Sequence, residues 1–183
     1  MSVGVATFLL VCITLVMIGY AYFAFATLWS AIGADAPWVP LGRKLIHVIA
    51  EHCSGLPVGV RVIDLGSGDG RILFAVASLN AGATCVGVEQ SRSLVAFARL
   101  RAIICGASRV VFRRGDFVRF PIHDYDVVIC YLWPNVMRTL AEKFRSELRP
   151  GAVILSARFA IPGWTHEQEL ITPDGSCFVY RIS

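Results

Sequence analysis

Charge is absent from the front of this 183-residue sequence: no residue before Asp35 carries a charged side chain. The chain is 56% hydrophobic, which is above the usual composition of a soluble globular domain. The uncharged run from Val3 to Leu28 exceeds the roughly 20 apolar residues that a helix needs to cross a bilayer. Aromatic residues gather toward its end, as is typical of a membrane interface. We therefore expect residues 1–32 to form a transmembrane anchor.

A cleaved signal peptide is the alternative interpretation of this segment, since Ala24-Phe25-Ala26 has the small-residue pattern of a cleavage site. However, no Lys or Arg precedes the apolar run, and the run is longer than the apolar region of a signal peptide. Both features favour an anchor. Because Arg43 and Lys44 follow the run, the positive-inside rule predicts a single-pass membrane protein whose remaining chain lies on the cytoplasmic side.

Metal-binding and disulfide patterns are also missing. The six cysteines include no Cys-x-x-Cys pair and no Cys/His ligand spacing, so we expect neither a metal site nor a disulfide framework.

Lysine is scarce: 15 of the 17 basic residues are arginine. The arginines within 109–119 are not accompanied by an aromatic-interleaved RNA-binding motif. A solvated or lipid-facing patch is therefore favoured over binding to nucleic acid.

The rest of the sequence alternates short apolar runs with helical stretches. Strands are expected at 61–65, 84–88, 109–113, 125–131 and 152–158, and helices at 41–53, 70–80, 91–105 and 135–148. Apolar strands that alternate with helices indicate a parallel sheet covered on both faces. Two further strands, 165–171 and 176–182, flank Pro173-Asp174-Gly175 and predict an antiparallel hairpin at the sheet edge. We expect a linker and leading helix at 33–59 and an α/β, Rossmann-like domain at 60–183.

A glycine-rich loop after the first strand is the most informative motif. Residues 62–71 read Val-Ile-Asp-Leu-Gly-Ser-Gly-Asp-Gly-Arg, a strand, a tight loop and a helix start, where open α/β sheets bind ligands. A dinucleotide-binding loop would have its third glycine where Arg71 stands. In this sequence the loop instead carries two carboxylates, Asp64 and Asp69. They suit a cationic ligand with hydroxyls, such as S-adenosylmethionine (SAM), better than a pyrophosphate. The residues expected to bind SAM here are Asp64, Gly66, Ser67, Gly68, Asp69 and Gly70.

Acids follow two later strands as well. Glu89, with Gln90 after it, ends the second strand, where a carboxylate can accept hydrogen bonds from both hydroxyls of a ribose. Asp116 and Phe117 follow the third strand, where an acid and a ring can hold the amino group and the face of an adenine. Taken singly, Glu89 or Asp116 is equally well interpreted as a solvated loop acid. Together with the glycine loop, these residues favour a SAM site.

These three motifs resemble those of class I SAM-dependent methyltransferases over roughly residues 60–183, which implies a mostly parallel sheet closed by a C-terminal antiparallel hairpin. Three further elements resemble the small membrane-associated protein-lysine methyltransferases of the ATP synthase c-subunit and adenine nucleotide translocase type. They are Pro37-Trp38-Val39-Pro40, Tyr131-Leu132-Trp133-Pro134 with Val136-Met137, and Arg158-Phe159 with Pro162-Gly163-Trp164. The narrower resemblance implies methylation of lysine in a membrane-associated protein. The animal members usually have a Phe-Gly-Val-type run in place of residues 131–133, which leaves the substrate open.

A lysine acceptor must lose its proton, and a desolvating aromatic pocket lowers the cost of that step. The expected pocket residues follow the fourth strand and are Tyr131, Trp133 and Pro134. Further candidate rings are Trp38, Phe159 and Trp164. No pattern indicates a catalytic base, and the Asn/Asp-Pro-Pro-Tyr motif of nucleobase and glutamine methylation is absent. A small-molecule or lipid methyltransferase and a non-catalytic SAM-binding module remain the alternatives.

Overall fold

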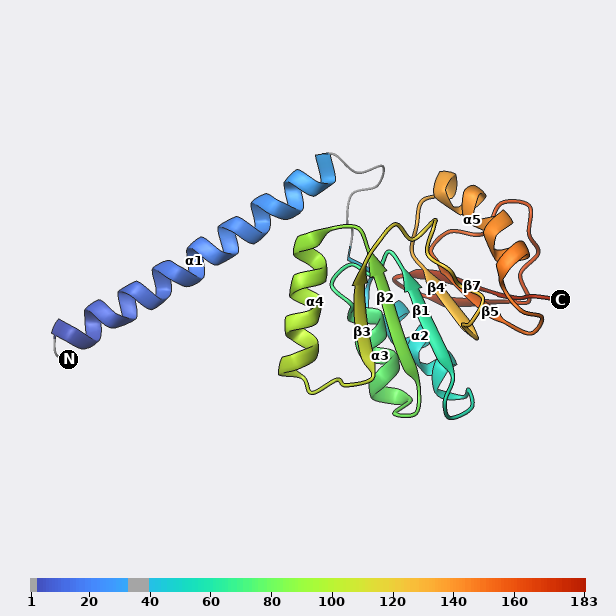
Figure 1. Cartoon of the computed structure of the whole chain (residues 1–183), viewed down its shortest axis with the longest axis horizontal. Coiled ribbons are helices and arrows are strands. Elements are labelled where there is room, and N and C mark those ends of the chain that lie inside the picture. The colour runs from blue at the N-terminus through green and yellow to red at the C-terminus, as the bar shows by residue number, and fades with distance from the viewer. Residues whose placement is uncertain (1–2, 33–39) are drawn as a thin grey trace. The chain divides into compact units, whose positions relative to one another are not determined.

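The computed structural model describes residues 3–32 and 40–183 (Figure 1). The chain divides into two compact units, Met1–Trp38 and Val39–Ser183. The first unit contains one helix, α1 (Val3–Ile32). Within α1, Thr7–Phe25 is long and apolar enough to cross a membrane, although signal sequences share that length and composition. The second unit contains the other elements and the candidate site.

A seven-stranded sheet forms the centre of the second unit. Its strands run in the order β3-β2-β1-β4-β5-β7-β6. The first five strands in this order are parallel to one another, whereas β7 pairs antiparallel with both β5 and β6. The strands are β1 (Arg61–Leu65), β2 (Thr84–Glu89), β3 (Val110–Arg114), β4 (Val127–Cys130), β5 (Val153–Ala157), β6 (Gln168–Thr172) and β7 (Gly175–Arg181). The expected parallel sheet with a C-terminal antiparallel hairpin is therefore confirmed.

Helices cover the two faces of the sheet. They are α2 (Arg43–Ser54), α3 (Arg71–Leu79), α4 (Arg92–Ile104) and α5 (Pro134–Glu147). Residues of α2, α3 and α4 share one core cluster with the sheet, which we call the α3-side core. Residues of α5 share a second cluster with the opposite face, the α5-side core. The central strands are buried because both faces carry apolar layers, as the sequence pattern predicts.

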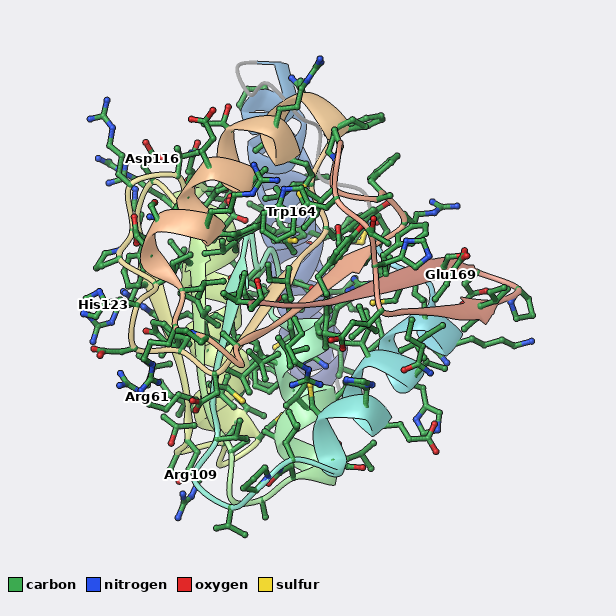
Figure 2. The ribbon with its side chains drawn as sticks, turned by 90° about the vertical axis from the view of Figure 1, so that its right-hand side faces the viewer. Arg61, Arg109, Asp116, His123, Trp164 and Glu169 are labelled. Atoms are coloured by element: carbon green, nitrogen blue, oxygen red, sulfur yellow. The ribbon has the colours of Figure 1, made fainter. Side chains whose placement is uncertain are left out.

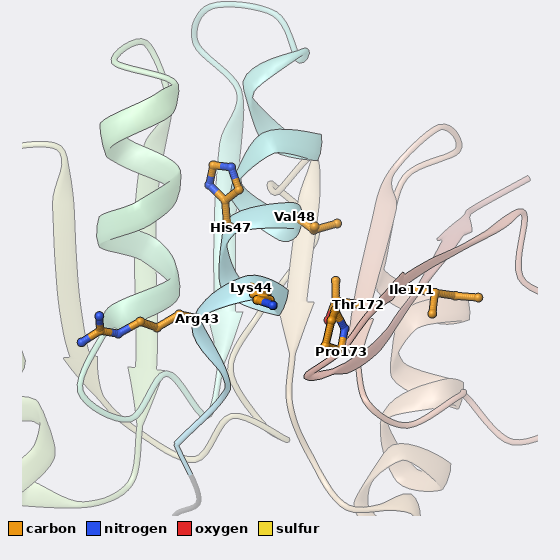
Figure 3. Close-up of a pocket in the computed structure, with 7 residues that line it drawn as sticks. All are labelled: Arg43, Lys44, His47, Val48, Ile171, Thr172 and Pro173. Atoms are coloured by element: carbon orange, nitrogen blue, oxygen red, sulfur yellow. The ribbon is translucent and has the colours of Figure 1, made fainter.

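Helix α2 is integral to this unit, because Leu45 and Ile49 are fully buried in the α3-side core. Its N-terminus is capped from a distant part of the chain: the backbone N–H of Lys44 donates to Asp174 Oδ2 at 2.8 Å. Asp174 lies in the turn between β6 and β7, so the carboxylate joins the leading helix to the hairpin. An open, mainly apolar groove lies between α2 and this hairpin (Figure 3). Its lining residues are Arg43, Lys44, His47, Val48, Ile171, Thr172 and Pro173.

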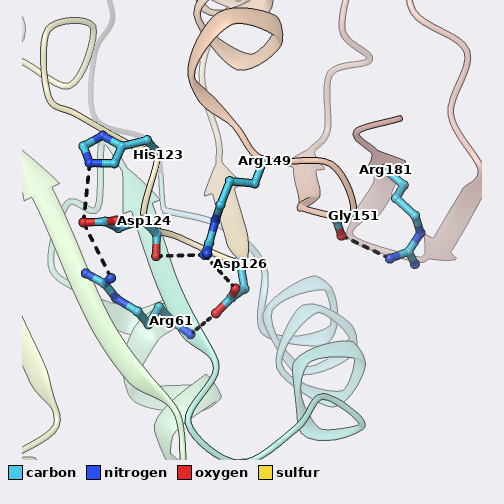
Figure 4. A network of polar contacts seen from close by, with 7 residues as sticks. All are labelled: Arg61, His123, Asp124, Asp126, Arg149, Gly151 and Arg181. Carbon is cyan, nitrogen blue, oxygen red and sulfur yellow. Dashed lines mark hydrogen bonds and ion pairs between the residues drawn. The ribbon is translucent and has the colours of Figure 1, made fainter.

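Polar contacts fasten the amino ends of the central strands (Figure 4). The N–H of Arg61, at the start of β1, donates to Asp126 Oδ2 at 2.8 Å, and Arg149 contacts Asp126 Oδ1 at 3.2 Å. Asp124 lies 3.5 Å from His123 and 3.6 Å from Arg61. These groups lie at the edge opposite the glycine loop. Their side chains are partly exposed, and exposed ion pairs of this kind contribute little to stability.

Candidate active site

The glycine loop joins β1 to α3 in a conformation that only glycine adopts easily. Gly66, Gly68 and Gly70 have φ angles of +80°, +55° and +77°, which lie in the left-handed region where a Cβ is disfavoured. The loop is bonded to the neighbouring strand, because the N–H groups of Gly66 and Ser67 both donate to Val88 O, at 2.9 and 3.1 Å. The loop is therefore held at the carboxyl edge of the sheet, as expected.

Neighbouring side chains pack closely on this loop. A Cβ at Gly66 would approach Leu132 Cδ2 to 3.0 Å, and one at Gly70 would overlap the ring of Phe112. Leu132 follows β4, so the expected substrate-pocket segment and the expected cofactor loop are in contact. The sequence placed both at strand ends, and the structure brings them together.

The Glu89 carboxylate links the glycine loop to the start of α4. Its Oε2 accepts the N–H of Gly68 at 3.0 Å, and its Oε1 accepts the N–H of Ser91 at 2.8 Å. Each carboxylate oxygen can accept a second hydrogen bond, so the group retains capacity for a hydroxyl-bearing ligand. The predicted contact to ribose stays a prediction, and the structure adds that Glu89 also shapes the loop.

Asp64 is a buried acid without a partner in the described part of the chain. Its side chain is 1% exposed, and neither carboxylate oxygen has a hydrogen-bond donor there. Burial, with the nearby charges of Glu89 and Asp69, raises the pKa of Asp64 to about 8. The hydroxyl of Ser67 is likewise buried without a partner among these residues. An unsatisfied buried polar group costs about 1–3 kcal/mol, so this pair fits a ligand with a cationic donor.

Asp69 is already engaged by the chain itself. Its carboxylate receives hydrogen bonds from Arg71 Nε at 2.9 Å and Nη2 at 2.7 Å. In the sequence, Arg71 was informative only because it interrupts a dinucleotide motif. The Asp69–Arg71 ion pair stabilises the start of α3 and occupies the Asp69 carboxylate. Asp64 is therefore the better candidate to bind a cationic group of the ligand. The Asp-x-Arg spacing at the start of a helix was the signal that could have indicated this ion pair.

The acid after β3 lies beside the end of β2, as expected. The N–H of Gly115 donates to Glu89 O at 3.0 Å, which joins the two strand ends. Asp116 is exposed near one edge of the unit (Figure 2), where its Oδ1 accepts from Val118 N at 2.9 Å and from Gln90 Nε2 at 3.5 Å. Phe117 is partly buried against the α5-side core. The structure thus brings Gln90 and Asp116 together, while the contacts of Asp116 and Phe117 with adenine stay predictions.

Three aromatic rings stack where β4 and β5 end. Phe159 stacks with Tyr131, with centroids 6.3 Å apart, and with Trp133 at 5.5 Å. Trp133 is 41% exposed, so the stack has an accessible side. Pro134 is the first residue of α5, where its fixed φ favours the helix start and the missing N–H costs nothing. Of the other candidate rings, Trp38 lies outside the described residues.

Trp164 lies apart from this stack. Its ring meets Tyr180 edge-on with centroids 6.0 Å apart, and the guanidinium of Arg145 lies 4.8 Å from its centroid. Trp164 packs against the α5-side core, whereas Tyr131 packs against the α3-side core. The sequence could not separate these rings, because the face that a ring joins depends on the turns after β5.

A strained turn positions Phe159. Arg158 has φ +66° and is the one non-glycine residue with positive φ among those that the structure describes. Such a conformation costs about 1–2 kcal/mol. The turn is held by two bonds, from the N–H of Arg158 to Ser176 O at 2.7 Å and from Ser156 Oγ to Phe159 O at 2.6 Å. No motif in the sequence indicated this turn, because its hydrogen-bond partner lies on β7.

Comparison with known proteins gives the family. Residues 64–168 match the model of the ANTKMT methyltransferase domain. The chain is 33% identical over 131 residues to the adenine nucleotide translocase lysine N-methyltransferase of Mus musculus, covering 71% of this chain and 56% of that protein. It is 32% identical over 143 residues to the protein-lysine N-methyltransferase of Saccharolobus islandicus, covering 76% and 87%. The chain therefore spans little more than half the length of the mouse relative.

A solved structure shows the same fold. It is an RNA methyltransferase from Salinibacter ruber in complex with S-adenosyl-L-homocysteine, with a TM-score of 0.74 and 31% identity. The match covers 79% of this chain and 94% of that one. The Rossmann-like methyltransferase sheet inferred from the residues is thus confirmed. With more than half of its length matched by the family model, this chain belongs to the ANTKMT methyltransferase domain family.

Proposed function

We propose that this chain is a SAM-dependent protein-lysine N-methyltransferase that acts on a membrane-associated protein. The observation that carries the proposal is the close approach of the Leu132 side chain to Gly66, where an added Cβ would lie 3.0 Å from Leu132 Cδ2. This approach brings together two parts of the site. One is the glycine loop, next to Asp64, the buried acid without a partner among the described residues. The other is the segment after β4, which bears two of the three stacked rings. Relatives named as lysine N-methyltransferases of adenine nucleotide translocase and of the ATP synthase c-subunit support the reaction and the substrate class.

The residues around the glycine loop fit SAM. When bound, SAM supplies an activated methyl group, and the protein supplies position and electrostatics. The unpartnered carboxylate of Asp64 suits the cationic amino group, and Glu89 retains acceptor capacity for the ribose hydroxyls. We assign Asp116 and Phe117 to the adenine, and the contact of Gln90 with Asp116 supports a binding role for Gln90. These assignments rest on burial, on unused acceptors and on position at neighbouring strand ends.

The aromatic stack suits a lysine side chain. A free lysine amine has a pKa near 10.4, so deprotonation at pH 7 costs about 4–5 kcal/mol. Rings that exclude water disfavour the ammonium form and lower that cost, while their faces attract an approaching cation. The partly exposed Trp133 lies at the open side of the stack, with Phe159 behind it. The stack therefore guides the ammonium and then favours the neutral nucleophile.

Membrane attachment is the second part of the proposal. The Thr7–Phe25 stretch of α1 has none of its residues buried and a mean hydropathy of 2.3, which suits a lipid environment better than water. With Arg43 and Lys44 after it, the positive-inside rule places the second unit on the cytoplasmic side. Such an anchor keeps the enzyme beside acceptors that lie in the same membrane.

The test is methyl transfer from radiolabelled SAM into a lysate, membranes included, of the native host that lacks this gene, followed by separation of protein, lipid, RNA and small molecules. We expect label in protein, recovered after hydrolysis as methyl-lysine. A parallel reaction with a Glu89→Ala variant controls for labelling by other enzymes.

Label in lipid or in a small molecule would show that the chain is a lipid or small-molecule methyltransferase and not a lysine methyltransferase. Label in RNA would favour the activity named for the Salinibacter ruber protein. If the chain binds SAM and no fraction is labelled, the proposed methyltransferase activity is wrong, and the chain is a non-catalytic SAM-binding module.

A further inference from the structure

Helix α4 is apolar on two opposite sides. Leu94, Val95 and Ala98 are buried against the sheet. At 100° per residue, Leu100, Ile103 and Ile104 lie on the other side of the helix. A helix that is apolar all round is normally enclosed by protein or lipid, so the outer side of α4 calls for an explanation.

The outer side is open to solvent in the second unit. Leu100 is 55% exposed, Ile103 78% and Ile104 75%. We call these three residues the α4 apolar face. Single exposed apolar residues are ordinary, whereas several on adjoining turns mark a contact surface. Cys105, the C-cap of α4, is exposed next to this face.

The charged residues of α4 itself have one sign. Helix α4 contains three arginines and no acid. By the 100° rule, Arg99 and Arg92 lie on the same side of α4 as Ile103, about one turn and three turns before it. Arg99 is held there by a hydrogen bond from its Nε to Phe112 O at 2.9 Å. Arg101 is engaged elsewhere, because its guanidinium lies 4.5 Å from the centroid of the Phe74 ring. Apolar residues bordered by arginines, without acids, match the pattern of helices that lie in the plane of an anionic bilayer surface.

The sequence also favours a bilayer over a soluble partner as the occupant. The short segment 33–39 connects α1 to the second unit. If α1 crosses a membrane, a connection of that length keeps the second unit near the membrane surface, since a chain spans at most about 3.6 Å per residue. The net charge of +4 lies wholly after α1, which favours anionic lipid over a basic or neutral protein surface.

We infer that the α4 apolar face is a membrane-contact surface, which inserts into the headgroup region of an anionic bilayer while Arg92 and Arg99 contact lipid phosphates. This inference rests on the membrane location given under the proposed function, yet it concerns a different element from α1. It assigns α4 a role in fixing how the second unit lies on the surface.

The experiment uses the full chain with Cys12→Ala and an environment-sensitive fluorophore on Cys105, since the remaining cysteines of the described part are buried. The protein is reconstituted into phosphatidylcholine vesicles with and without phosphatidylglycerol. Some vesicles carry a nitroxide lipid labelled near the headgroup. We expect at least about twofold quenching by this nitroxide, because interfacial helices insert their apolar side by ~5–10 Å. Phosphatidylglycerol should strengthen the quenching.

Two variants are compared in this background. Leu100→Gln/Ile103→Gln/Ile104→Gln should abolish the quenching. Val58→Gln/Ile171→Gln, at residues that are 90% and 76% exposed elsewhere on the unit, should leave it unchanged. Both variants must bind S-adenosylhomocysteine like the parent, which shows that they fold. Resistance to alkaline extraction reports separately whether α1 is inserted.

The outcomes separate the two ideas. Extraction resistance without quenching overturns the α4 inference and leaves the anchor standing. Quenching without extraction resistance supports the α4 inference and removes the anchor. A blue-shifted label that nitroxide lipid does not quench means that a second copy or another protein covers the face, and this also overturns the inference.

Discussion

Glu89 accepts a hydrogen bond from the backbone N–H of Gly68 across 3.0 Å, so the acid at the end of β2 holds the glycine loop that follows β1. Its other oxygen accepts from Ser91 N at 2.8 Å. The residue proposed to bind ribose thus also fixes the loop that approaches the rest of the cofactor. Loss of its charge should therefore affect binding through two routes.

Glu89→Gln should weaken SAM binding by roughly 10–100-fold. Hydrogen bonds to a charged acceptor contribute about 1.5–3 kcal/mol, and a side-chain amide would oppose one of the two N–H donors. Isothermal titration with SAM measures the effect, and Glu142→Gln, at an exposed position on α5, is the matched control. An unchanged Kd for Glu89→Gln would remove Glu89 from the site.

Asp64→Asn should stabilise the ligand-free protein increasingly as the pH rises. Because burial raises the pKa of Asp64 from 3.8 to about 8, the folded protein holds a proton there that the unfolded chain has lost. The parent therefore loses up to about 1.4 kcal/mol per pH unit across that window, with no further loss above pH 8. The asparagine variant lacks this penalty.

Thermal unfolding of both proteins, repeated at steps of about one pH unit from about pH 5 to 9, measures the difference in their free energy of unfolding. Asp116→Asn, at an exposed position, is measured in parallel as the matched control. The same Asp64→Asn variant should bind SAM more weakly, because it cannot offer a charge to the cationic amino group. Parallel stability curves for the parent and Asp64→Asn would show that the acid is not buried as described.

Phe159→Leu should reduce methyl transfer about tenfold or more and leave the Kd for SAM within about twofold. The substitution keeps an apolar side chain but removes the ring that stacks with both Tyr131 and Trp133, and a cation–π contact is worth about 0.5–2 kcal/mol. Methylation of host membranes and SAM titration are compared with Ile171→Leu as control. Equal losses of binding and turnover would place Phe159 in the cofactor site instead.

Asp174→Ala should destabilise the second unit by about 0.5–2 kcal/mol, the usual cost of losing a helix N-cap. The carboxylate accepts the N–H of Lys44 across the gap between the hairpin and α2. Asp174→Asn keeps an acceptor and should recover most of the loss. Urea unfolding in detergent measures both variants. A loss of equal size in Asp174→Asn would show that charge at the helix end matters more than the cap.

Much of the fold follows from local pattern. The apolar runs around Val62 and Val86 are too continuous for half-exposed strands, so a parallel sheet covered on both faces was the expected solution. The helix starts at Ser91 and Pro134 are also readable, because a capping hydroxyl and an N1 proline act within their own turn. Strand ends differ by up to three residues: β4 begins at Val127 and ends before Tyr131, and β6 begins at Gln168 where residue 165 was expected.

The sequence by itself determined the elements, the order of the acids at the strand ends and the glycine loop, because those depend on spacing along the chain. Only the tertiary structure decided which side chains share a partner. Arg71 engages Asp69, while Asp64 has no hydrogen-bond partner among the residues that the structure describes. The turn at Arg158 brings Phe159 against two rings, whereas Trp164 packs on the other face of the sheet. Those outcomes depend on contacts between distant strands, and spacing along one segment does not encode them.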